Sequence, residues 1–69
     1  MTIETLQFVT VGCCGTHRMA HVERRDGLRW TVYDDGEAGY RIVPTRDGVL
    51  CGAIESGLTA DQVAERLLA

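Results

Sequence analysis

The chain has 69 residues, of which 45% are hydrophobic and 25% charged, and its formal net charge is -3. A chain of this length supports one domain with a small core, so we expect a single domain over residues 1–69 that gains stability from a partner, such as a second copy in a homodimer. No run of about 18 apolar residues is present to cross a membrane. The negative charge disfavours direct nucleic-acid binding, which depends on neutralising phosphates.

The N-terminal region is predicted to be extended. Glu4 and Thr5 interrupt the only apolar stretch that a signal peptide would use, so we expect a cytoplasmic protein. Extended-forming residues predict a first strand over about 3–11. A second strand is predicted over about 17–24, after a turn with two glycines. A helix over residues 17–25 is the alternative, because Thr16 is a suitable N-cap.

The turn that follows the second strand allows two registers. A three-residue loop over 25–27, with its glycine in the left-handed region, sets Val22 opposite Trp30 and Glu23 opposite Arg29. A two-residue loop would instead oppose two arginines and pair the tryptophan with a carboxylate. The three-residue loop is therefore predicted.

Three more strands are predicted after this turn, over about 28–33, 40–44 and 49–54. A polar turn joins the first two of them. Pro44 is expected to limit pairing at the end of its strand, because proline cannot donate a ladder hydrogen bond.

The segment 59–68 is predicted to be an amphipathic helix. Thr59 is a natural N-cap, and Gln62 three residues later completes a capping box. One stripe of the helix is apolar and consists of Ala60, Val63, Ala64, Leu67 and Leu68. The sequence thus predicts an α+β fold, a small antiparallel β-meander of four to five strands with this C-terminal helix packed on one face.

Carrying the registers through all strands predicts two apolar faces, of which one short helix covers only one. The predicted core face holds Leu6, Phe8, Ala20, Val22, Leu28, Trp30, Val32, Val43, Cys51 and Ala53. The second face holds Val9, Val11, Met19, Tyr33, Tyr40, Ile42 and Ile54, with the two tyrosines facing each other. An exposed apolar face of this size indicates either a binding partner or strong curvature of the sheet.

Cysteines and histidines form the one cluster that suggests chemistry. Cys13, Cys14, His17 and His21 resemble a ligand set, and a metal-binding or thiol redox sensor is one alternative function. On a strand, however, the two histidines stand about 13 Å apart and do not converge. Cys51 is interpreted as a small buried core residue. No group is placed to orient a cysteine nucleophile, so we expect no enzyme activity and no cofactor.

The remaining interpretation is a small non-enzymatic protein-binding module. Its size and lack of motifs suit a phage or mobile-element regulator or inhibitor of a larger host protein or nucleoprotein complex. The predicted partner-binding residues are Val9, Val11, Met19, Tyr33, Tyr40, Ile54 and the acidic turn Asp34, Asp35 and Glu37. Single-stranded nucleic-acid binding on the Tyr33 and Tyr40 face is a further alternative, since bases stack on exposed rings.

Overall fold

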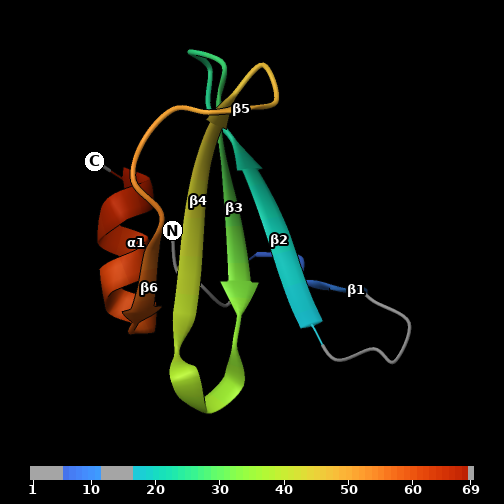
Figure 1. Cartoon of the computed structure of the whole chain (residues 1–69), viewed down its shortest axis with the longest axis vertical. Coiled ribbons are helices and arrows are strands. Elements are labelled where there is room, and N and C mark those ends of the chain that lie inside the picture. Colours follow the sequence, from blue (N-terminus) through green and yellow to red (C-terminus); the bar gives the residue numbers. More distant parts are fainter. Residues whose placement is uncertain (1–5, 12–16, 69) are drawn as a thin grey trace.

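The computed structural model describes residues 6–11 and 17–68, which form one antiparallel sheet and one helix (Figure 1). The elements are β1 (Val9–Val11), β2 (His17–Glu23), β3 (Leu28–Asp34), a 3-10 turn (Gly36–Ala38), β4 (Tyr40–Arg46), β5 (Val49–Leu50), β6 (Glu55–Leu58) and α1 (Ala60–Leu68). Strands β1 to β5 follow one another in the sheet, and β6 also pairs with β4. The predicted α+β meander with one C-terminal helix is confirmed. No helix in this part of the chain is long and apolar enough to span a membrane.

The β2–β3 hairpin has the predicted register. Val22 pairs with Trp30, and Glu23 pairs with Arg29, to which its carboxylate is also ion-paired. Within the loop, the Arg24 amide donates to the Leu28 carbonyl at 2.8 Å, and Gly27 has a φ of 89°. The strand over His17–Glu23 also excludes the alternative helix.

The register between β3 and β4 differs from the prediction by one residue. Asp34 pairs with Tyr40, and Tyr33 pairs with Arg41, because the connecting turn spans residues 35–39. A one-residue shift moves every side chain of a strand to the opposite face. Tyr40 and Ile42 therefore lie on the core face, and the predicted pairing of the two tyrosines on the second face is wrong.

The same shift moves Val43 off the core face, since it pairs with Thr31 on the opposite side from Ile42. The prediction of Val43 as a core residue is therefore wrong. Pro44 is interior to β4, which continues to Arg46. It is tolerated there because its nitrogen faces away from β3, where β4 has no strand partner between Ile42 and Thr45 among the described residues; on that side its carbonyl accepts the Cys51 amide at 3.1 Å.

The predicted fifth strand over 49–54 is divided in the structure. β5 contains only Val49 and Leu50, and pairing with β4 resumes at β6, in the segment between the predicted fifth strand and the predicted helix. The intervening residues leave the sheet, so Cys51 and Ala53 are exposed and their assignment to the core is wrong.

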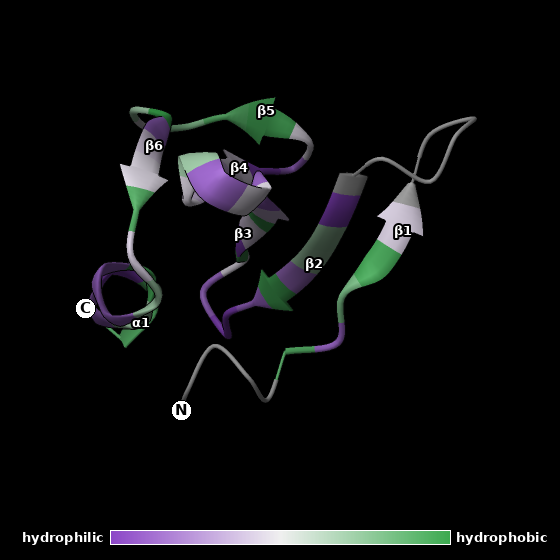
Figure 2. Ribbon diagram, turned by 90° about the horizontal axis from the view of Figure 1, so that it is seen from below, coloured by the Kyte–Doolittle hydropathy of each residue, from purple (hydrophilic) through white to green (hydrophobic). Residues whose placement is uncertain are grey.

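The helix α1 covers the face of the sheet that carries the core. Its Val63 and Leu67 pack with Val32, Ile42 and Leu58. The capping box is confirmed, since the Gln62 amide donates to Thr59 Oγ1 at 3.2 Å and the Thr59 amide donates to Gln62 Oε1 at 2.9 Å. Apolar residues also pack around the edge of this core: Leu6, Phe8, Val22, Trp30, Tyr40 and Ala60. Figure 2 shows α1 and the segment that leads into β1 on the same side of the sheet.

Candidate functional site

The opposite side of the sheet is covered by no helix or strand among residues 6–11 and 17–68. We call this surface the open face. The ladder registers assign to it Val9, Met19, His21, Glu23, Arg29, Thr31, Tyr33, Arg41, Val43 and Thr45. These residues form three rows across the strands, and each row has a different chemistry.

The first row is apolar and aromatic and consists of Val9, Met19, Tyr33 and Arg41. Val9 is 56% exposed, whereas Met19 and Tyr33 are half-buried by their sheet neighbours. The Arg41 guanidinium carbon lies 4.3 Å from the centre of the Tyr33 ring, the geometry of a cation–π contact. Arg41 Nε lies 3.5 Å from Asp35 Oδ2 but has no hydrogen-bond partner within the described residues. This nitrogen is buried, so the stacked pair presents a broad surface through the remainder of the Arg41 side chain, which is 39% exposed.

The middle row consists of His21, Thr31 and Val43. Thr31 is buried between His21 and Val43, its neighbours in the ladder. Its hydroxyl is hydrogen-bonded to His21 Nδ1 at 3.1 Å. This contact holds the imidazole against the sheet.

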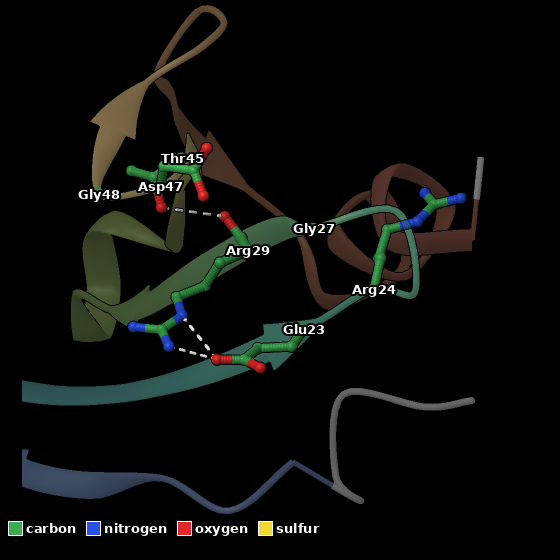
Figure 3. Close-up of a pocket in the computed structure, with 7 residues that line it drawn as sticks. All are labelled: Glu23, Arg24, Gly27, Arg29, Thr45, Asp47 and Gly48. Atoms are coloured by element: carbon green, nitrogen blue, oxygen red, sulfur yellow. Dashed lines mark hydrogen bonds and ion pairs between the residues drawn. The ribbon is translucent and has the colours of Figure 1, made fainter.

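The third row is charged but internally paired. Glu23 accepts hydrogen bonds from Arg29, and the Thr45 hydroxyl donates to the Arg29 carbonyl at 3.5 Å. This row borders a cavity of about 240 Å³, drawn in Figure 3 and lined by Glu23, Arg24, Gly27, Arg29, Thr45, Asp47 and Gly48. Because acidic and basic side chains are balanced around it, the cavity has no clear preference for an anion or a cation.

A second hollow of about 450 Å³ lies beside β2, where the chain that leads into β1 diverges from the sheet. It is lined by Leu6, Gln7, Val9, Met19, Ala20, His21 and Val22. Within the part of the chain that the structure describes, no carboxylate, lysine or arginine lines it. The hollow is therefore apolar with a few neutral polar groups, in contrast to the charged cavity at the other end of the open face.

The structure brings together only part of the predicted binding surface. Val9, Met19 and Tyr33 share one row, and Val11 continues β1 opposite His17. Tyr40 lies on the other face, where its ring centre is 6.4 Å from that of Phe8.

Ile54, also predicted to lie on the second face, is 53% exposed in the segment between β5 and β6. It therefore belongs to neither sheet face.

The predicted acidic turn is largely neutralised within the chain. Asp34 is ion-paired with Arg18 at 3.1 Å, and its other oxygen accepts the Gly36 amide. Asp35 is ion-paired with Arg41. Glu37 is exposed in the 3-10 turn. Two of the three carboxylates therefore already have partners.

The predicted cysteine and histidine cluster is only partly visible. Cys13 and Cys14 lie outside the described residues, and His17 and His21 are four residues apart on one strand. Among the residues that the structure describes, no three His, Cys, Asp or Glu side chains gather to hold a metal ion. Cys51 is an exposed thiol.

Sequence reasoning did not identify Arg41 or the hollow beside β2 as features of interest. Arg41 was missed because the predicted β3–β4 register paired Tyr33 with Tyr40. In the structure Asp34 pairs with Tyr40, and this register places Arg41 opposite Tyr33. The hollow arises because strand pairing stops at Val9, whereas the apolar pattern of the sequence continues toward the N-terminus. Comparison of the chain with known protein families, curated proteins and solved structures finds no match in any of the three.

Proposed function

We propose that this chain is a non-enzymatic module that binds another protein through the open face. The observation that carries the proposal is the row formed by Val9, Met19, Tyr33 and Arg41, which no described element covers. Tyrosine, methionine and arginine are enriched in protein interfaces, where their long side chains cover apolar area and also offer hydrogen bonds.

The chemistry of the row specifies the partner contact. An apolar side chain of the partner packs on Met19 and Tyr33, and a hydrogen-bond acceptor beside it approaches the Arg41 side chain, which is 39% exposed. The paired charges of Glu23 and Arg29 then form a polar rim. An apolar centre with a polar rim is the usual anatomy of such interfaces.

The more specific role stays a prediction. A phage or mobile-element regulator or inhibitor is expected from size and the lack of motifs, and binding through the open face is compatible with it. The nucleic-acid alternative required Tyr33 and Tyr40 on one face, and the β3–β4 register separates them. We therefore do not propose it.

Affinity capture with variant baits tests the proposal. Tyr33→Ala and Met19→Ala should each weaken retention of the captured protein by about tenfold or more, because truncation of a buried aromatic or apolar anchor costs about 2 kcal/mol. Leu68→Ala is the matched control, since Leu68 is 64% exposed on α1, on the other side of the sheet.

Light scattering on the purified chain separates self-association from binding of another protein.

In the capture experiment, equal retention of the captured protein by all three variants would refute the open face as the binding surface. Equal loss in the Leu68→Ala control would assign the binding to α1 instead. Circular dichroism of each variant establishes that the fold is intact.

A further inference from the structure

The outer edge of β2 is paired along only part of its length. β1 contacts His17, Arg18 and Met19, and no strand within residues 6–11 and 17–68 pairs with Ala20–Glu23 on that side. We call this stretch the free edge. An unpaired strand edge is a template for another extended chain.

The hydrogen-bond pattern of the hairpin shows which backbone groups face the free edge. The Arg24 amide donates to the Leu28 carbonyl, so the alternate residues Val22 and Ala20 also direct their amides and carbonyls toward β3. His21 and Glu23 direct theirs to the opposite side. No backbone hydrogen bond joins these two residues to another described residue on that side.

The free edge opens into the apolar hollow of about 450 Å³. Leu6, Val9, Met19 and Val22 supply apolar walls on both sides of the strand, and no charged side chain from residues 6–11 or 17–68 lines the space. Side chains of an added strand alternate between the two sides of the sheet, so apolar pockets on both sides accept a neutral apolar sequence. A charged peptide would lose hydration there without gaining a partner.

Residues 6–8, which lead into β1, do not occupy the free edge. Leu6 and Phe8 pack against the core. In continued register with β1, Phe8 would pair with Ala20 and Leu6 with Val22. The segment would then have to leave its present packing to occupy the edge. This packing leaves the edge available to a different chain.

We infer that the free edge of β2 binds an extended, uncharged peptide of a partner protein by β-strand addition. The peptide exchanges backbone hydrogen bonds with His21 and Glu23 and inserts apolar side chains into the hollow. This inference rests on the proposed function and specifies how the partner is held.

A displayed library of random peptides of about eight residues provides the probe, because this length exceeds that of the four-residue free edge and allows for unpaired ends. We expect enrichment of neutral sequences with apolar residues. N-methylation of a synthetic enriched peptide at alternate positions should weaken binding by about tenfold or more, because each blocked amide leaves a carbonyl of the edge unpaired. Methylation at the intervening positions should have much less effect.

Hydrogen exchange on the labelled protein locates the binding. The His21 and Glu23 amides should exchange rapidly in the free protein and become protected by the peptide, whereas the Ala20 and Val22 amides are protected in both states. Unchanged exchange at His21 and Glu23 in the presence of a bound peptide would overturn the inference.

His21→Pro is the informative variant, because it removes an amide that faces the free edge and leaves the β2–β3 ladder intact. It should abolish peptide binding without loss of the fold. If proline proves disruptive, Val9→Lys provides a second variant by placing a charge in the hollow at an exposed position. If these variants still bind the peptide, strand addition is wrong.

The captured partner protein distinguishes this inference from the proposed function. If Tyr33→Ala weakens its capture and His21→Pro does not, the open face binds the partner and strand addition fails. If neither variant affects its capture, both proposals fail.

Discussion

Neighbouring residues of one strand lie in different environments on the two faces of this sheet. Ile42 and Val43 are adjacent in β4, yet Ile42 is fully buried under α1 and Val43 lies on the uncovered side. The covered face is apolar and packed around Leu58 and Val63. The open face mixes apolar, aromatic and paired charged groups. The difference indicates that the covered face contributes most to the stability of the fold, whereas the open face is the one proposed for binding.

The largest expected contrast comes from these two adjacent residues. Ile42→Ala should reduce the free energy of unfolding by about 3 kcal/mol, because it leaves a cavity in the core. Val43→Ala should cost about 1 kcal/mol or less, because it removes two methyl groups from a half-buried site. Urea denaturation followed by Trp30 fluorescence measures both.

Since a domain of this size has a total stability of only about 3–10 kcal/mol, Ile42→Val provides a milder core variant. Similar losses for Ile42→Ala and Val43→Ala would remove the distinction between the faces.

Two glycines of the 35–39 turn test how closely β6 packs against the start of β4. A Cβ on Gly39, whose φ is 86°, would lie 2.8 Å from the Leu58 carbonyl oxygen, so Gly39→Ala should cost about 2 kcal/mol or more. Gly36→Ala is the control, because it has a similar φ of 66° and open space around it, and should cost about 1 kcal/mol. Thermal unfolding compares them, and equal losses would show that the contact with Leu58 is unimportant.

The helix cap gives a smaller effect on the covered face. Thr59→Ala should cost about 1 kcal/mol, because the Gln62 amide loses its acceptor. Thr59→Ser retains the hydroxyl and should restore most of the stability. The midpoint of chemical denaturation measures both variants. A Thr59→Ala midpoint equal to that of the original chain would show that tertiary packing alone holds α1.

The smallest effect concerns the hairpin at the charged end of the open face. The Leu28 amide donates to the Asp26 carboxylate at 3.1 Å. This hydrogen bond, together with the positive charge of Arg46, lowers the pKa of Asp26 from its ordinary value of 3.8. A lowered pKa in the folded state means that protonation favours unfolding. This contribution is therefore present above pH 3.8 and is lost as the pH falls through the folded-state pKa.

Asp26→Asn should weaken the dependence of the free energy of unfolding on pH between acidic and neutral pH. Denaturation at a series of pH values measures the slope for both chains. An unchanged slope would mean that Asp26 titrates alike in the folded and unfolded chains.

Local chemistry predicted the first hairpin and the helix, because each depends on residues close in sequence. Opposite charges at Glu23 and Arg29 selected the register, and Thr59 with Gln62 marked the start of the helix. The β3–β4 register lacked such a signal. Ile42 and Val43 are both apolar, so side-chain alternation alone did not decide which of them faces the core.

The fifth strand was mispredicted for a different reason. The run from Val49 to Ile54 is apolar, but it includes Gly52 and ends before the residues that pair again with β4. The Ser56–Gly57 pair is typical of a turn, although in β6 it accommodates an irregular register. Because of these errors, the predicted binding surface was only partly correct. Val9, Met19 and Tyr33 share one row of the open face, whereas Tyr40 and Ile54 lie elsewhere.

The order of the strands also has a consequence for folding kinetics. β2, β3 and β4 are neighbours in sequence and in space, joined by the turns at 24–27 and 35–39. Short loops cost little entropy to close, so this three-stranded unit is expected to form early. β6 and α1 follow it in the chain and complete the core through Leu58, Val63 and Leu67. Until β6 and α1 join this three-stranded unit, its apolar side therefore remains uncovered.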